Sequence, residues 1–301
     1  MTPTGPAAKI LAISTFIFVL MALPVRADDT DLPASHSITP CLYATGFEYA
    51  DGLVIDDKGT LFVSNYRGNG RIGRILADGT ASVLCDLCSV ASVNDRPVLP
   101  GGLTLDRHGR LIVADLGVGR LLRVSSDGST IEVLADRCGG VRFGQVDDVA
   151  VDPKWNIYFT DSNGSSLRSP VGSVMRYDIV AGQVSQIATG FANPSGLAVS
   201  PDGKLLAVAE RDHFRLVLYD LKPDGRATNR RVLIAFPTET VEPIIGGTFG
   251  PTGLMFDGQG HIFAAMGAGG LINVVDLETG ELVRQYDAGG KKVTNLFLID
   301  G

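Results

Sequence analysis

The stretch DDVAVDPKWNIYFTD (residues 147–161) holds two apolar runs on either side of a short polar turn. Runs of this length, separated by a turn that contains Asp and Pro, are typical of two antiparallel β-strands. The same pattern recurs as ADGLVIDDKGTLFVSN (50–65), GGLTLDRHGRLIVAD (101–115), SGLAVSPDGKLLAVAE (195–210) and TGLMFDGQGHIFAAM (252–266). The chain therefore contains an internal repeat of this two-strand pattern.

The repeats follow one another at intervals of about 49 residues. Each continues with two more strand-like runs around a polar turn such as Asp-Gly or Thr-Gly, and helical periodicity is absent after residue 27. Four antiparallel strands per unit, repeated five or six times, indicate a β-propeller. We interpret the aspartates that precede the turn inside the repeat as turn-forming residues: Asp56, Asp106, Asp152 and Asp257.

The two ends of the chain carry half-units. Residues 38–46 resemble an outermost strand with no unit before it, and TNLFLIDG (294–301) resembles an innermost strand with nothing after it. We expect them to be the fourth and first strands of one blade whose middle strands are missing. The prediction is an all-β, six-bladed β-propeller of four-stranded antiparallel blades, with the last blade incomplete, forming a single domain over residues 28–301. The alternative is a five-bladed ring with the last segment docked irregularly.

Residues 1–27 have the features of a secretory signal peptide. A positive charge at Lys9 precedes an apolar run over residues 10–23, and residues 25–27 form a small-x-small cleavage site. The run is shorter than the roughly 20 residues that span a bilayer. We therefore expect a secreted or periplasmic protein with no stable membrane insertion after cleavage. The alternative is an uncleaved N-terminal anchor.

Export permits disulfide bonds, and four cysteines are available: Cys41, Cys85, Cys88 and Cys138. Structural disulfides are expected, although the spacing does not choose among the three possible pairings. The composition is 45% hydrophobic and 20% charged, which excludes intrinsic disorder. The net charge of −7, with scattered Lys and Arg, argues against a nucleic-acid partner.

Chemistry is expected where the inner strands of the blades begin, because these strands line the central channel. Asp51 and Asp147 open two of them and would converge on one axis, with Ser195 and Thr252 beside them. Carboxylates with hydroxyl groups suit a hard cation, most of all Ca²⁺, which could polarise a lactone or ester carbonyl and activate water. The alternative is that these side chains only cap strand ends.

Three further side chains are expected at the same face as substrate-binding candidates. Asn65 and Glu210 end the second strands of their repeats, and His213 is the one histidine placed there. No G-x-S-x-G motif is present and no histidine spacing supports a zinc site, so a serine hydrolase of that type and a zinc enzyme are not indicated.

The segments VDDVAVDPKWNIYFTD, NPSGLAVSPDGKLLAVAE and GPTGLMFDGQGHIFAA resemble the SMP-30/gluconolactonase-like propellers. Residues 145–221 also resemble strictosidine synthase-like propellers. The first resemblance implies a divalent metal held by a Glu, two Asn and an Asp at the channel mouth. The matching positions here all differ from that set: Asp51, Asp147, Ser195 and Thr252.

The family's Asn-Asp motif corresponds to Asp147 and Asp148, which are therefore the catalytic candidates by resemblance. The family's proposed base coincides with Thr252, which cannot accept a proton at neutral pH. Two functions follow as hypotheses. The first is an exported hydrolase of lactones or esters assisted by a divalent cation, and the second is a non-catalytic propeller that binds a small molecule or peptide on its top face.

Overall fold

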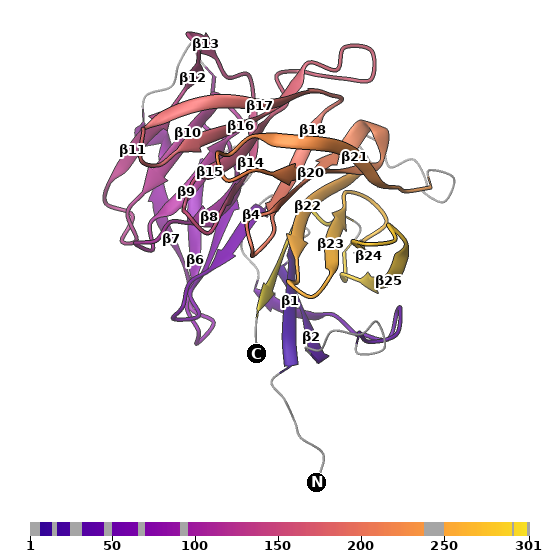
Figure 1. Cartoon of the computed structure of the whole chain (residues 1–301). Helices are drawn as coiled ribbons and strands as arrows, with labels where there is room; N and C mark the ends of the chain where they lie inside the picture. Colours follow the sequence, from indigo (N-terminus) through magenta and orange to yellow (C-terminus); the bar gives the residue numbers. More distant parts are fainter. Residues whose placement is uncertain are drawn as a thin grey trace.

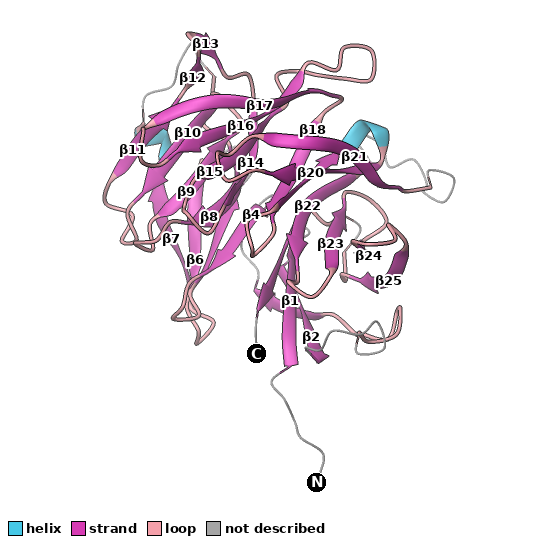
Figure 2. Cartoon of the chain, in the orientation of Figure 1, coloured by secondary structure: helices cyan, strands magenta, loops and turns pink. Residues whose placement is uncertain are grey.

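The computed structural model describes residues 7–13, 17–24, 32–44, 50–65, 70–90, 96–237, 250–290 and 292–299. Nearly all of its regular structure is β-strand (Figure 1), as the repeat pattern predicted. Two short 3-10 turns follow strand ends (Figure 2), namely η2 (Leu87–Ser89) and η3 (Arg211–His213). An all-β fold is therefore confirmed.

Five four-stranded antiparallel sheets are each built from one continuous segment, and we number them blades 1 to 5. Blade 1 consists of β4 (Ala50–Ile55), β5 (Leu61–Asn65), β6 (Arg71–Ile75) and β7 (Ala81–Asp86). Blade 2 consists of β8 (Pro100–Leu105), β9 (Leu111–Asp115), β10 (Arg120–Val124) and β11 (Ile131–Ala135). Blade 3 consists of β14 (Val146–Val151), β15 (Ile157–Asp161), β16 (Gly172–Asp178) and β17 (Gln183–Phe191).

Blade 4 consists of β18 (Pro194–Val199), β19 (Leu205–Glu210), β20 (Arg215–Leu221) and β21 (Ala227–Ala235). Blade 5 consists of β22 (Pro251–Phe256), β23 (His261–Met266), β24 (Leu271–Asp276) and β25 (Leu282–Asp287). Between blades 2 and 3 in the sequence, β12 (Arg137–Cys138) and β13 (Val141–Arg142) form a two-stranded antiparallel ribbon. The continuous repeats thus form five blades, which differs from the count of six predicted from the sequence.

A further four-stranded sheet joins the two ends of the described chain, and we call it the closing sheet. Its order is β26 (Asn295–Ile299), β1 (Ala7–Ile13), β2 (Ile17–Pro24) and β3 (Cys41–Ala44). As predicted, β3 and β26 belong to one sheet. The middle strands that the sequence analysis expected to be missing are β1 and β2. Both lie within the segment interpreted as a signal peptide. A short apolar run is compatible with a β-strand as well as with a signal sequence, so its composition alone does not distinguish the two.

The sheets are arranged in a ring. The inner strands contact one another in the order β4, β8, β14, β18, β22 and β26, and β26 returns to β4. Apolar side chains fill the space between neighbouring sheets; for example, Tyr158 of blade 3 packs with Leu206 and Val208 of blade 4. Burial of both faces of each blade is what holds the ring together.

Glycines at the second position of the repeat allow the inner strands to approach closely. A Cβ atom at Gly52 would lie 2.3 Å from the Gly101 carbonyl oxygen, and one at Gly196 would lie 1.8 Å from the Thr252 carbonyl oxygen. Contacts this short are not compatible with a side chain, because the obstacle is backbone. The glycine at this position therefore sets how tightly the central channel closes.

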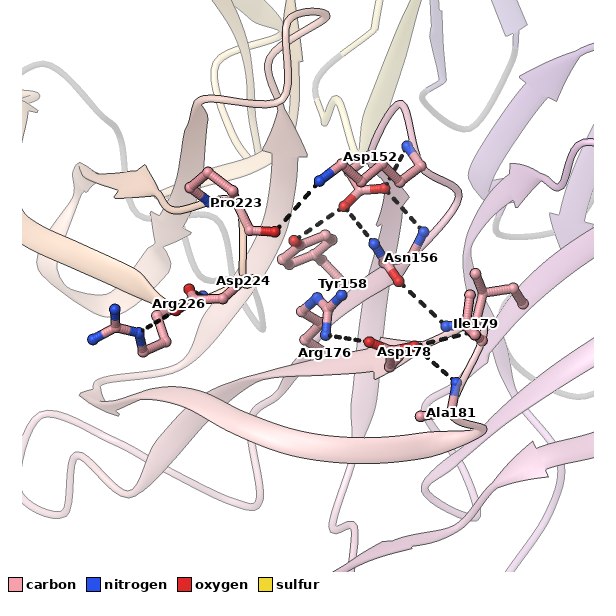
Figure 3. A network of polar contacts seen from close by, with 12 residues as sticks. Asp152, Asn156, Tyr158, Arg176, Asp178, Ile179, Ala181, Pro223, Asp224 and Arg226 are labelled. Atoms are coloured by element: carbon pink, nitrogen blue, oxygen red, sulfur yellow. Dashed lines mark hydrogen bonds and ion pairs between the residues drawn. The ribbon is translucent and has the colours of Figure 1, made fainter.

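The turn-forming role of the repeated aspartates is confirmed. Asp152 Oδ1 accepts hydrogen bonds from the Lys154 and Asn156 amides at 2.8 and 2.9 Å, and Asp56, Asp106 and Asp257 do the same in their own turns. Figure 3 shows that the Asp152 turn also contacts blade 4, where Lys154 Nζ donates to the Pro223 carbonyl at 3.4 Å. This network lies at the opposite end of the inner strand from Asp147, so it stabilises the fold and not the candidate site.

The expected disulfides are not formed. None of Cys41, Cys85, Cys88 and Cys138 takes part in a disulfide bond. Cys85 is buried, and burial raises the pKa of its thiol to about 11. Among the described residues, no helix has the length and apolar character needed to cross a membrane.

Candidate functional site

The residues that open the inner strands surround one end of the ring, which we call the channel mouth. They are the second residues of β4, β8, β14, β18 and β22 and the residue just before β26, namely Asp51, Gly101, Asp147, Ser195, Thr252 and Thr294. The structure brings two of the carboxylates together: the charge of Asp147 acts on Asp51, and the Ser195 hydroxyl donates a hydrogen bond to Asp147. Gly101 lies between these two aspartates in the ring and adds no side chain.

Both mouth aspartates hold protons more tightly than usual. Burial raises the pKa of Asp51 well above its ordinary value, and the charges of Asp147 and Asp148 raise it further. Burial also raises the pKa of Asp147, while the Arg211 guanidinium and the Ser195 hydrogen bond oppose that shift. Carboxyl groups whose pKa values are raised by burial and by a neighbouring charge can hold a proton near neutral pH, which is a property that general acids need.

Asp148 lies one residue deeper and is 7% exposed. The Leu197 amide of the next blade donates to its Oδ2 at 3.1 Å, and its carboxylate occupies the space left by Gly102 of the preceding blade. Burial raises its pKa to about 7, and a hydrogen bond from the Asn295 side chain opposes the rise. Asp148, one of the two predicted catalytic residues, therefore connects inner strands of three sheets, and its charge also raises the pKa of Asp51.

Arg211 is a residue of the mouth that the sequence analysis missed. It begins η3, directly after β19, and its positive charge lowers the pKa of both Asp51 and Asp147. The position that follows the second strand of the repeat holds Tyr66, Leu116, Ser162, Arg211 and Gly267. Aligning the repeats at that position would have singled it out, because it is the one charged residue among them.

Glu210, a predicted substrate-binding residue, is fully buried and engaged within the protein. Its Oε1 accepts from the Ala192 amide at 2.8 Å, and its Oε2 accepts from Arg215 Nε at 2.6 Å. Asp115 and Asp161 end the second strands of blades 2 and 3 and likewise accept backbone amides from the segment that leads into their blade. The acid at this position is thus a repeated structural element that holds the start of the inner strand.

The other two predicted substrate-binding residues are placed differently. His213 lies in η3, half exposed, with its Nε2 3.9 Å from Glu210 Oε1. Asn65 ends β5, where its backbone pairs with Ala50, and its side chain lies outside the described part of the structure. Of these residues, His213 alone is shown to have a side chain accessible near the mouth.

The four predicted ligands alone do not complete a site for the expected divalent cation. The Thr252 hydroxyl donates to backbone carbonyl oxygens, that of Val293 at 2.8 Å and that of Ala265 at 3.1 Å. The Ser195 hydroxyl donates to the Asp147 side chain. Ca²⁺ takes six to eight oxygen ligands, whereas the predicted set supplies two carboxylates and two hydroxyl groups, and the positive charge of Arg211 acts on both carboxylates. Within the described residues, no group of three or more His, Cys, Asp or Glu side chains is arranged to hold a metal ion.

A hollow of about 350 Å³ elsewhere on the molecule does not compete with the mouth as a candidate site. It is lined by residues 185–187 and 224–228, at the outer edge of blades 3 and 4. Its one acidic residue, Asp224, already pairs with Arg226 at 2.7 Å. The mouth therefore remains the place where unusual ionisation and converging side chains coincide.

The fold and the mouth together define a β-propeller with a carboxylate-lined channel. The family model for the SMP-30/Gluconolactonase/LRE-like region matches residues 129–300, which is more than half of the chain. The chain belongs to the SMP-30/gluconolactonase/LRE-like family, as the resemblance of its repeats predicted.

Two relatives illustrate the similarity. A gluconolactonase of Zymomonas mobilis is 28% identical over 177 residues, which cover 56% of this chain and 49% of the relative. The Arabidopsis thaliana protein named strictosidine synthase-like 6 is 26% identical over 300 residues, covering 89% of this chain and 75% of the relative. The chain thus spans about half the length of the gluconolactonase that it matches.

A solved structure described as a gluconolactonase from Xanthomonas campestris superposes with a TM-score of 0.66. The two chains are 20% identical, and the match covers 100% of this chain and 95% of the other. At this level of identity the similarity supports the propeller fold alone, and any evidence about activity has to come from the residues of the mouth.

Proposed function

We propose that the protein hydrolyses small lactones or esters at the channel mouth. The observation that carries the proposal is the pair Asp51 and Asp147, which come from non-adjacent blades: burial raises the pKa of both, and the charge of Asp147 raises that of Asp51 further. Names of relatives that include gluconolactonase and lactonase support the choice of substrate class.

The reaction needs a base and an acid in turn. The ionised member of the carboxyl pair takes a proton from water, whose oxygen attacks the carbonyl carbon and forms the new C–O bond. The tetrahedral intermediate then expels the ring oxygen, and a protonated carboxyl group gives that oxygen its proton. Atoms and charge balance, and no step passes through a metal. The divalent cation expected from the sequence stays a prediction, which calcium titration tests.

Steady-state hydrolysis of γ- and δ-lactones, followed by proton release, tests the proposal. We expect Asp147→Asn and Asp51→Asn each to lower kcat/KM by about 100-fold or more, because general acid–base catalysis contributes on that scale. Asp224→Asn, on the exposed outer turn, serves as the matched control. Wild-type rates in both folded mouth variants would refute the assignment. Lactone binding without turnover by the wild type would favour the alternative of a non-catalytic binding propeller.

We also propose export to the periplasm or the medium, supported by the charge at Lys9, the apolar run and the small-x-small site at residues 25–27. The same segment supplies β1 and β2 in the structure, so cleavage after Ala27 would remove both strands from the closing sheet. Intact-mass measurement of the protein from the culture fractions decides whether residues 1–27 are cleaved or retained. A product that begins at Asp28 supports export with cleavage, and a product that retains residues 1–27 contradicts it.

A further inference from the structure

The inner strand of each of blades 1 to 5 carries a β-bulge at the channel mouth. In blade 1, Ala50 pairs with Asn65 and Leu53 pairs with Val63, so two residues of β4 lie opposite one residue of β5. The registers of the other four blades shift at the same place. The first of the two bulge residues is always the one that opens the inner strand, and a bulge re-aims the side chains that it carries. The bulge therefore sets the direction of the mouth side chains.

The single residue opposite the bulge differs from blade to blade. It is an alanine in three blades and a residue with a hydroxyl group in two, namely Ala114, Ala209, Ala265, Ser64 and Thr160. The two hydroxyl groups belong to blades 1 and 3, whose inner strands open with Asp51 and Asp147. Among these five blades, a hydroxyl group thus lies opposite the bulge only where the bulge presents a carboxylate.

Both hydroxyl groups bind the backbone amide that follows the mouth aspartate. In blade 1, the Gly52 amide donates to Ser64 Oγ at 2.6 Å. In blade 3, the Asp148 amide donates to Thr160 Oγ1 at 3.1 Å. The Thr160 hydroxyl in turn donates to the Ser195 carbonyl at 2.7 Å, which ties the bulge of blade 3 to the inner strand of blade 4. Both hydroxyl residues are fully buried, so these hydrogen bonds are shielded from bulk water.

We propose that Ser64 and Thr160 are positioning residues that fix the direction of the mouth aspartate in their own blade. A bulge interrupts the ladder of backbone hydrogen bonds, and a buried amide needs a partner. The hydroxyl group supplies that partner and holds the peptide plane after the aspartate in one orientation. The effect on the backbone stands by itself, whereas its effect on rate rests on the proposed hydrolysis.

Four variants of the full chain test the proposal. Thr160→Val removes the hydroxyl group and keeps the branched shape, Thr160→Ser keeps the hydroxyl group, and Ser64→Ala tests blade 1. The matched control is Ser200→Ala, at the opposite end of β18 from the mouth. Ser200 is 7% exposed, and its Oγ accepts from the Leu205 amide at 2.9 Å and donates to Asp202 Oδ1 at 2.7 Å. The control therefore removes a comparable pair of hydrogen bonds far from the aspartates.

Lactone hydrolysis and amide hydrogen exchange give two separate measurements. We expect Thr160→Val and Ser64→Ala each to lower kcat about tenfold or more with KM changed less than about twofold, because a misplaced group loses rate while the substrate still binds. Thr160→Ser should recover most of the wild-type kcat, and Ser200→Ala should stay within about twofold of it. The Asp148 amide should exchange faster in Thr160→Val, and the Gly52 amide in Ser64→Ala, but neither in the control.

The two measurements separate failure of this inference from failure of the proposed function. Wild-type kcat in folded Thr160→Val and Ser64→Ala, or an equal loss of kcat in Ser200→Ala, would overturn the inference. If the wild type hydrolyses no lactone, the proposed function fails and amide exchange alone decides the positioning: unchanged exchange at Asp148 and Gly52 would overturn it. If Thr160→Val does not fold, Ser64→Ala decides by the same two measurements.

Discussion

Replacement of Glu210 by alanine tests whether this residue is structural or binds substrate. The carboxylate is fully buried, accepts the Ala192 amide and pairs with Arg215 Nε at 2.6 Å. Removing it leaves a partly buried guanidinium without its closest partner and a buried amide without an acceptor. Breaking a buried pair by removal of one partner costs about 3–5 kcal/mol.

In a domain of this size, a loss of that magnitude lowers Tm by about 10 °C. Urea and thermal unfolding measure the change, and Asp224→Ala is the matched control. Asp224 and Arg226 form an ion pair with side chains 54% and 74% exposed, and such surface pairs contribute less than about 1 kcal/mol. Glu210→Gln should fall between the two, because it keeps an acceptor for Ala192 but loses the charge opposite Arg215.

A small effect would refute this reasoning. If Glu210→Ala unfolds within about 1 kcal/mol of the wild type, the buried pair does not hold the blade together. If in addition the variant raises KM for a lactone with kcat unchanged, the predicted substrate-binding role would be the better explanation of Glu210.

Three other predictions concern the ring, the buried carboxylate and the thiols. Gly196→Ala places a Cβ against the backbone of blade 5 and should lower the free energy of unfolding by about 2 kcal/mol or more. Its control, Gly79→Ala, lies at φ 85° with nothing within 4 Å of the added Cβ, and should lower the free energy of unfolding in urea by only about 1 kcal/mol. The pKa of Asp148 is raised to about 7 in the native state, against 3.8 when unfolded, so between these values the native state binds a proton that the unfolded state has lost. Stability should therefore fall as pH rises from about 4 to about 7. Asp148→Asn should flatten this slope, and an unchanged slope would contradict a raised pKa at Asp148. In a thiol-modification assay Cys88 should react much faster than Cys85, and Tm should be the same with and without reductant; a reductant-sensitive Tm would indicate disulfides.

The repeat made most of the fold predictable, because each copy carries its own strand pattern and turn residues. The aspartates before the inner turns illustrate this: the amides that Asp152 and its counterparts accept lie two and four residues away, so local sequence determines the geometry. The number of blades was harder, because the closing sheet combines both ends of the chain and uses residues with the composition of a signal peptide. Disulfides were inferred from the expected compartment, which does not determine where the fold places each thiol: Cys41, Cys85 and Cys138 lie in three different sheets, and no disulfide is formed.

The candidate site was predictable only in part. Repeat alignment placed Asp51 and Asp147 at the same end of the ring, and the structure brings them within electrostatic reach. It could not show that Thr252 turns its hydroxyl to the backbone, that Asp148 bonds the next inner strand, or that the charge of Arg211 acts on both carboxylates. These features depend on side-chain direction, which a repeat pattern with a period of about 49 residues does not specify.

The pairing of Lys9 with Ile299 has a practical consequence for work with the intact chain. The inner strand β26 starts beside the channel mouth at Asn295 and ends at Ile299, next to the start of β1 in the closing sheet (Figure 1). A short linker between Lys9 and Ile299 would therefore join the two strands at the end of the sheet away from the mouth, and a circularly permuted chain could open instead in a surface turn such as the one at Gly79.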